Sequence, residues 1–212
     1  YNNRHPENPL EKELFVLTGG IFVFGFIQLI AGAYWKNGKK NGLVEVVDDL
    51  FHMPATMKKL AIIQFFTWFA LFSMWIYATP ALAQHLAGTS DTSSSAYNDI
   101  GNWVGVLFGV YNGAAALFAF LLPVIASKTS RPMTHLISLV AGGVGLITFY
   151  IFKDKNMLII SMILMGLAWS SILSMPYSML TASLPSHKMG VFMGIFNFFI
   201  VIPQILAATL LG

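Results

Sequence analysis

The chain alternates between long apolar runs and short polar stretches. Six runs are long enough to cross a bilayer core of about 30 Å, which takes roughly 20 helical residues. They cover residues 14–34, 60–83, 103–126, 136–152, 157–180 and 189–211. Each run is continuously apolar, whereas membrane β-strands alternate apolar and polar residues at period two. The pattern therefore predicts an all-α integral membrane protein with six transmembrane helices.

The stretch between the first two runs, residues 36–57, has a different pattern. Four apolar residues recur there at helical spacing and three acidic residues fall opposite them: Leu43, Val46, Val47 and Leu50 against Glu45, Asp48 and Asp49. This arrangement predicts a short amphipathic helix at the membrane surface, with a solvated tether as the alternative. The expected domains are residues 1–35, a linker of residues 36–57, and residues 58–212.

Composition excludes the other broad classes of protein. Of 212 residues, 56% are hydrophobic and 10% are charged, and there is no cysteine. The mean hydropathy is +0.69. These values exclude a soluble enzyme, a disordered chain and a disulfide-built module. The chain begins without an initiator methionine, so we expect it to be a piece of a longer protein.

The basic residues predict the orientation of the spans. Eight lie between spans one and two, three and four, or five and six: Lys36, Lys39, Lys40, Lys58, Lys59, Lys128, Arg131 and Lys188. The other side carries four: Arg4, Lys12, Lys153 and Lys155. Cytoplasmic loops are richer in Lys and Arg, so the first side is predicted to be cytoplasmic, in an inner or plasma membrane.

Uncharged polar residues mark candidate contacts inside the spans, where Asp, Glu, Lys and Arg do not occur. In the second span a single helical face carries Gln64, Trp68, Phe72, Trp75 and Thr79. Carboxamides bond sugar hydroxyls and aromatic rings stack on the C–H face of a sugar, so this face suits an uncharged sugar. Ordinary helix packing is the alternative interpretation for Trp75.

Small and polar residues form stripes on three further spans. The third span has Gly105, Gly109 and Gly113 beside Asn112; the fifth has Gly166, Ser170, Ser174, Tyr177 and Thr181; the sixth has Gly190, Gly194, Asn197, Val201 and Gln204. Close helix packing explains the glycines. The carboxamides need a partner, either a ligand or a neighbouring helix. Pro176 and Pro203 predict interruptions of the fifth and sixth helices.

No motif indicates covalent chemistry or a metal. The five histidines, at positions 5, 52, 85, 135 and 187, lack metal-ligand spacing and fall at span ends or in loops. His85 suggests either a pH-sensing group or a solvated residue at a span end. Phosphate-binding loops and nucleophile elbows are also missing from the sequence. We therefore expect no enzyme activity, no cofactor and no nucleic-acid partner.

Residues 175–177 and 190–204 carry a resemblance to a known family. Met175-Pro176-Tyr177, followed by G-x-x-x-G-x-x-N-x-x-I-V-x-P-Q from Gly190 to Gln204, resembles the tenth and eleventh helices of the sucrose/proton symporters. These belong to the major facilitator superfamily and are similar to the glycoside-pentoside-hexuronide cation symporters. The resemblance extends over about residues 58–212.

The resemblance implies that the six spans are helices six to eleven of a twelve-helix transporter. It implies secondary transport of a disaccharide or glucoside, such as sucrose or maltose, coupled to protons and working by alternating access. Together with the polar faces, it yields these candidate substrate-binding residues: Gln64, Trp68, Trp75, Asn112, Trp169, Tyr177, Asn197 and Gln204. The expected partners are the sugar, a proton, the lipid bilayer and the remaining helices.

One departure and two rival interpretations accompany this expectation. Where plant sucrose carriers have acidic residues in and beyond the seventh helix, this sequence has Ala78 and Pro80, then Gln84 and His85. The resemblance therefore does not place proton coupling in these helices. The rivals are a major facilitator exporter of amphipathic compounds and a non-transporting helical membrane scaffold.

Overall fold

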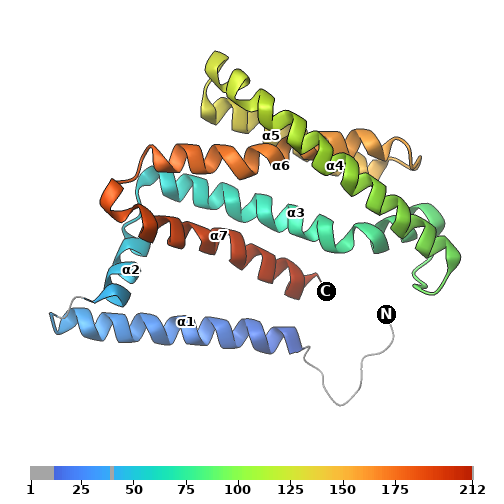
Figure 1. Ribbon diagram of the computed structural model, residues 1–212. Coiled ribbons are helices and arrows are strands. Elements are labelled where there is room, and N and C mark those ends of the chain that lie inside the picture. Colours follow the sequence, from blue (N-terminus) through green and yellow to red (C-terminus); the bar gives the residue numbers. More distant parts are fainter. Residues whose placement is uncertain (1–11, 39–40, 212) are drawn as a thin grey trace. The chain divides into compact units, whose positions relative to one another are not determined.

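The computed structural model describes residues 12–38 and 41–211, and in these ranges every regular element is a helix (Figure 1). The elements are α1 (Lys12–Lys36), α2 (Gly42–Phe51), α3 (Ala55–Ala87), α4 (Ser95–Lys128), α5 (Arg131–Ile151), α6 (Leu158–Thr181), a short 3-10 helix (Ser186–Lys188) and α7 (Met189–Leu210). Six of these helices are long and apolar enough to cross a membrane. The six predicted spans are thus confirmed, and α2 confirms the predicted short linker helix.

Local side-chain chemistry sets several of the helix ends. The side chains of Asn41, Ser94 and Ser130 accept hydrogen bonds from backbone N–H groups in the first turns of α2, α4 and α5. Such caps satisfy donors that a helix start otherwise leaves without partners. Gly38 and Gly88 follow α1 and α3 with φ values of +70° and +62°, a conformation that glycine adopts without strain.

The predicted interruptions at the prolines are wrong. Pro176 lies inside α6 and Pro203 inside α7, and both helices continue through them. Pro80 and Pro123 are likewise enclosed in α3 and α4. A proline removes one backbone hydrogen bond, but packing on either side can hold the remaining bonds in register.

The chain forms two compact units, and the boundary between them falls inside α3. Unit 1 comprises the described parts of Tyr1–Ser73 and Leu184–Gly212, and unit 2 is Met74–Ser183. Unit 1 thus contains α1, α2, the first part of α3, and α7. Unit 2 contains the rest of α3 with α4, α5 and α6. The domain division expected from the sequence remains a prediction.

Close backbone approach holds unit 2 together. At Gly166 of α6, an added Cβ would lie 2.6 Å from the carbonyl oxygen of Tyr111 in α4. At Gly145 of α5, an added Cβ would lie 2.8 Å from the carbonyl oxygen of Ser161 in α6. Glycine therefore permits α6 to pack tightly against both neighbours. Their shared core includes Leu107, Leu122, Met162 and Met165, all fully buried.

Hydrogen bonds within residues 88–94 shape the loop between α3 and α4. The backbone N–H and the hydroxyl of Ser93 both donate to Oδ1 of Asp91, at 2.9 and 2.7 Å. Donation from the hydroxyl and then from the backbone lowers the pKa of Asp91 below its ordinary value. Ser90 donates to Oε1 of Gln84 at 3.0 Å. The loop therefore carries a negative charge without a basic residue.

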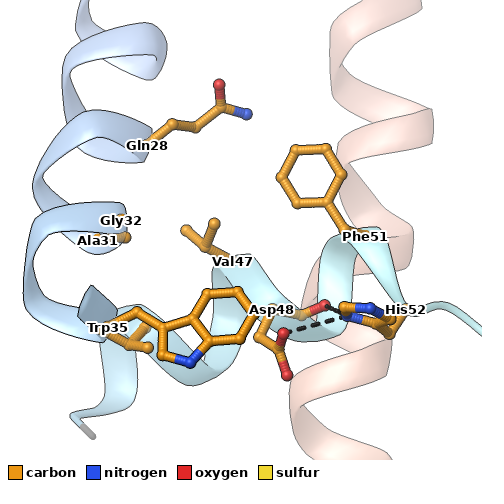
Figure 2. A pocket seen from close by; sticks show the side chains of 9 residues that line it. Gln28, Ala31, Gly32, Trp35, Val47, Asp48, Phe51 and His52 are labelled. Atoms are coloured by element: carbon orange, nitrogen blue, oxygen red, sulfur yellow. Dashed lines mark hydrogen bonds and ion pairs between the residues drawn. The ribbon is translucent and has the colours of Figure 1, made fainter. Parts of the chain in front are cut away.

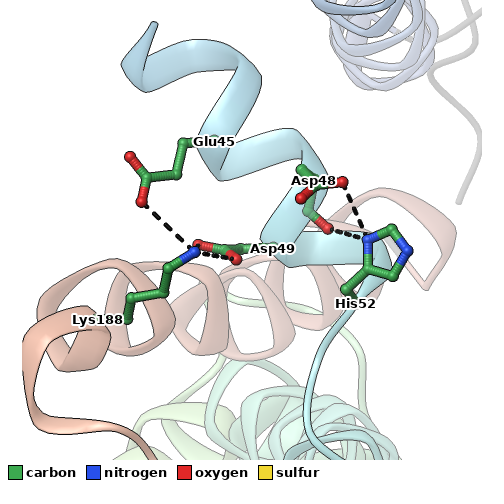
Figure 3. A network of polar contacts seen from close by, with 5 residues as sticks. All are labelled: Glu45, Asp48, Asp49, His52 and Lys188. Atoms are coloured by element: carbon green, nitrogen blue, oxygen red, sulfur yellow. Dashed lines mark hydrogen bonds and ion pairs between the residues drawn. The ribbon is translucent and has the colours of Figure 1, made fainter. Parts of the chain in front are cut away.

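In unit 1, α2 lies between the end of α1 and the start of α7 (Figure 1). Nζ of Lys188 donates to both carboxylate oxygens of Asp49, at 2.8 and 3.0 Å, and lies 3.5 Å from Oε1 of Glu45 (Figure 3). The side chain of Asp49 is only 7% exposed. This ion pair connects the linker helix to the last span.

Candidate functional site

The eight predicted site residues divide between the two units. Unit 1 holds Gln64, Trp68, Asn197 and Gln204, and unit 2 holds Trp75, Asn112, Trp169 and Tyr177. Each group lies on helices that cross the membrane, and neither group includes an ionisable acid or base of the Asp, Glu, Lys or Arg type.

Aromatic rings from three helices meet in unit 2. The rings of Trp75 and Trp169 contact edge to face, with centroids 5.0 Å apart and planes at 86°. Tyr111 lies nearly parallel to Trp169, with centroids 6.3 Å apart. These three residues, from α3, α6 and α4, form what we call the aromatic cluster. Two of its members were predicted from the sequence as site residues.

Tyr111 is the member that sequence reasoning missed. Its side chain is 2% exposed, and its backbone carbonyl lies where Gly166 allows α6 to approach. A signal was present, since Val104, Leu107, Tyr111 and Ala114 recur at helical spacing and are all buried. The glycine stripe singled out in the sequence lies on the other side of the same helix.

Asn112 lies on the opposite, exposed side of α4. Its Nδ2 donates to the carbonyl oxygen of Phe108 at 2.8 Å. Gly105, Gly109 and Gly113 share this side, and a Cβ at any of them would meet nothing within 4 Å. Within unit 2 no other helix packs against these glycines, and the sequence interpretation that close helix packing explains them stays a prediction. The face remains open.

The last span presents a similar open face in unit 1. Asn197 is exposed, and a Cβ added at Gly190 or Gly194 would meet nothing within 4 Å. Gln204, seven residues beyond Asn197, is partly buried, and Pro203 is buried. A helix repeats its direction nearly every seven residues, so Asn197 and Gln204 point to the same side of α7.

Gln64 is the most deeply buried of the predicted residues. It is 0% exposed, and neither Nε2 nor Oε1 of its amide has a hydrogen-bond partner among the described residues. Trp68, one turn further along α3, is partly buried. A buried amide without a partner is destabilising by about 1–3 kcal/mol, which makes Gln64 a candidate for contact with a polar ligand.

Tyr177, the remaining predicted residue, is partly buried in α6. The neighbouring Ser178 accepts a hydrogen bond at its carbonyl oxygen from Nη1 of Arg131, at 3.1 Å. That bond ties the end of α6 to the start of α5. The contacts described for unit 2 do not bring Tyr177 into the aromatic cluster.

His135 lies near an end of its span, as the sequence interpretation had it, but it is buried there. It occupies the second turn of α5, is 3% exposed, and its Nδ1 lies 2.9 Å from Oγ of Ser171 in α6. In the described chain, Nε2 of this ring has no hydrogen-bond partner. His85 is partly buried in α3 and stacks on Tyr150 of α5, with centroids 5.8 Å apart.

The arrangement suits noncovalent binding of an uncharged polar molecule. Carboxamides and aromatic rings supply hydrogen bonds and stacking, and none of the eight candidate residues offers a charged group to an ionic ligand. Within residues 12–38 and 41–211, no group of three His, Cys, Asp or Glu residues is placed to hold a metal ion.

Comparison with known proteins gives one match. Residues 12–208 match the family model described as Major Facilitator Superfamily. No curated protein and no solved structure matches the chain.

Proposed function

Because the chain belongs to the major facilitator superfamily, a family of membrane transporters, we propose that it works in secondary active transport of an uncharged sugar. The proposed substrate is a disaccharide or glucoside such as sucrose or maltose. Transport would proceed by alternating access and be driven by protons. The proposed location is a cell membrane, inner or plasma, with the Lys-rich and Arg-rich side in the cytoplasm.

The buried amide of Gln64 is the observation that carries this proposal. Its donor and acceptor are fully enclosed and unbonded among the described residues, inside a membrane-spanning helix. A sugar hydroxyl both donates and accepts, so it can satisfy the two ends of one carboxamide. Substrates with a net charge fit less well, because none of the eight candidate residues carries an opposite charge.

The remaining site residues supply complementary chemistry. Trp75 and Trp169 offer aromatic surface of the kind that packs against the apolar face of a sugar ring. Asn112 and Asn197 place carboxamides on the open faces of α4 and α7. In the proposed transporter these open faces line the sugar path or receive further helices of the same protein.

Uptake of radiolabelled sugar by the full-length protein tests the proposal. We expect concentrative uptake of maltose or sucrose that a proton uncoupler abolishes. Gln64→Leu should reduce the apparent affinity by roughly tenfold, since an unpaired ligand hydroxyl weakens binding by about 1–3 kcal/mol. Gln84→Leu is the matched control, because Gln84 is exposed near the end of the same helix.

Three results would contradict the proposal. Absence of uptake for every disaccharide and glucoside would remove the sugar assignment, and uptake that persists with the uncoupler would remove the proton. Equal effects of Gln64→Leu and Gln84→Leu would remove Gln64 from the site.

An exporter of amphipathic compounds is the second candidate. The aromatic cluster favours it, because edge-to-face rings bind aromatic drugs and dyes as readily as they bind a sugar. Efflux of a fluorescent dye from cells that express the full-length protein, without sugar uptake, would select this candidate.

A further inference from the structure

A pocket of about 280 Å³ lies between the end of α1 and the linker helix α2, and none of the eight candidate site residues lines it. Figure 2 shows Gln28 and Trp35 on α1 facing Val47, Asp48 and Phe51 on α2, with His52 directly after α2. All of these residues belong to unit 1. The amide of Gln28 and the ring of Phe51 flank one end of the pocket, and Trp35 and Asp48 flank the other.

The walls of this pocket combine aromatic surface with one carboxylate. Trp35 and Phe51 are 58% and 61% exposed, so their rings are accessible to a ligand. Nδ1 of His52 lies 3.1 Å from Oδ1 of Asp48, and Oδ2 of Asp48 has no hydrogen-bond partner among the described residues. No lysine or arginine lines the described pocket.

Of the three acidic residues on α2, Asp48 is the one that does not lie beside Lys188, so its carboxylate can bind a cation from outside the chain. Lys188 bonds Asp49 and lies near Glu45, so those two acids on the side toward α7 share one basic partner (Figure 3). Among the described residues, the imidazole of His52 is the one basic group beside Asp48. The pocket thus complements a positive group rather than an anion.

The position of the pocket in the chain indicates the source of that positive group. Trp35 is the second-to-last residue of the membrane-spanning α1, and tryptophans at span ends lie at the level of lipid head groups. The apolar residues of α2 belong to an amphipathic helix of the kind that rests on a membrane surface. The mouth of the pocket therefore lies where phospholipid head groups are concentrated.

We propose that this pocket binds the ammonium head group of a zwitterionic phospholipid. The carboxylate of Asp48 pairs with the ammonium and the indole of Trp35 provides cation–π contact, as in aromatic sites for choline-like groups. Val47 and Phe51 contact the methylene groups next to the phosphate. The bound lipid would hold α1 and α2 together at the membrane surface. This inference does not depend on the identity of the transported substrate.

Gly32 offers a way to close the pocket without disturbing the helix. It lines the pocket, and a Cβ added there would meet nothing within 4 Å. Gly32→Leu should place a side chain inside the pocket, and leucine is favoured over glycine in a helix interior. This variant complements Asp48→Asn, which removes the charge and keeps the shape.

Lipid retention by the purified full-length protein tests the inference. The protein is reconstituted with equal amounts of phosphatidylethanolamine, phosphatidylcholine and phosphatidylglycerol, and the lipids that remain bound in mild detergent are counted by native mass spectrometry. We expect phosphatidylethanolamine and phosphatidylcholine, whose head groups carry an ammonium, to be retained in preference to phosphatidylglycerol. Asp48→Asn and Trp35→Leu should each lower that preference by about fivefold, and Gly32→Leu should abolish it.

The matched control is Glu45→Gln, which removes the same charge from the same helix on the side toward Lys188 and should leave the preference unchanged. Preferential retention of both ammonium-bearing lipids, or of phosphatidylethanolamine alone, over phosphatidylglycerol supports the site. Equal retention of phosphatidylglycerol by the unaltered protein would overturn it. So would an unchanged preference in Asp48→Asn and Gly32→Leu when melting curves show that both variants are folded.

Discussion

The glycines of this chain differ in what surrounds their Cα atoms. Some lie against a neighbouring helix, and others face open space. A Cβ at Gly166 would lie 2.6 Å from the Tyr111 carbonyl oxygen and 2.9 Å from Cβ of Ala114, whereas one at Gly109 would meet nothing within 4 Å. Gly166→Ala should therefore force α4 and α6 apart and lower the free energy of unfolding by about 1–3 kcal/mol. Thermal unfolding in detergent measures this.

Gly109→Ala is the control for Gly166→Ala, because both replace a glycine inside a transmembrane helix. We expect Gly109→Ala to be neutral or slightly stabilising, since alanine is favoured over glycine in a helix interior. Equal melting temperatures for the two variants would contradict this prediction, because they would show that α4 and α6 accommodate a methyl group at position 166 without loss of stability.

Asn197 distinguishes ligand contact from helix packing on the open face of α7. If it binds the substrate, Asn197→Leu in the full-length protein should weaken sugar affinity by about 1–3 kcal/mol, the effect of leaving a hydroxyl unpaired. The melting temperature should change little, because the residue is exposed on its helix. Sugar affinity and melting temperature measured on one purified sample test this prediction.

The opposite pattern would assign Asn197 to the protein's own packing. An interhelical hydrogen bond contributes about 0.6 kcal/mol on average in membrane proteins, so its loss lowers the melting temperature slightly. With an unchanged dissociation constant, that result would remove Asn197 from the proposed site.

Sequence reasoning identified chemical types at the site better than it identified contacts. Trp75 and Trp169 were chosen for their rings, and they do pack together. The helical spacing around Tyr111 indicates a packed face, but neither Tyr111 nor His135 has a residue near it in the sequence that reveals its partner on another helix. Their roles depend on which residue of another helix lies opposite, here Trp169 and Ser171. Such pairings are not encoded in local spacing.

At the scale of elements, the linker helix α2 is joined to α7 by Lys188. Lys188→Met should lower the melting temperature of the protein, because it leaves the buried carboxylate of Asp49 without its cation. The double variant that also carries Asp49→Asn should recover part of the lost melting temperature, because the uncompensated carboxylate charge is then removed. A double-mutant cycle on melting temperature measures this coupling.

Glu45→Gln is the comparison within the same network. Glu45 is 52% exposed and lies 3.5 Å from Nζ of Lys188, so its removal should have a smaller effect than removal of Lys188. Strictly additive effects of Lys188→Met and Asp49→Asn would mean that the ion pair does not contribute to holding α2 on α7.

The helices themselves were predictable, and their continuity was not. Long apolar runs mark spans that the structure confirms. The interruptions expected at Pro176 and Pro203 do not occur. A proline removes a hydrogen bond wherever it stands, but whether the helix then breaks depends on the packing around it. Both of these prolines are buried.

At the scale of the whole molecule, the distribution of basic residues predicts which side of the membrane each loop occupies. Thr92 lies in the loop between α3 and α4 and Ser186 between α6 and α7, and both are exposed. Thr92→Cys should react with a membrane-impermeant maleimide added outside intact cells, and Ser186→Cys should not. These 212 residues contain no natural cysteine, so within them each label reports one position.

Permeabilising the cells provides the control, because Ser186→Cys should then react as well. Reaction of Ser186→Cys in intact cells, with protection of Thr92→Cys, would reverse the orientation. The reversal would also move the pocket between α1 and α2 to the other leaflet.

The ion pair between Asp49 and Lys188 also has an evolutionary consequence. The two residues are 139 positions apart in the chain but share two hydrogen bonds, whereas Asp48, the immediate neighbour of Asp49, points to the other side of the same helix (Figure 3). Among homologues, loss of the base at position 188 should accompany loss of the acid at position 49. Position 48 should vary independently of both, so adjacent acids in one short helix should have separate mutational histories.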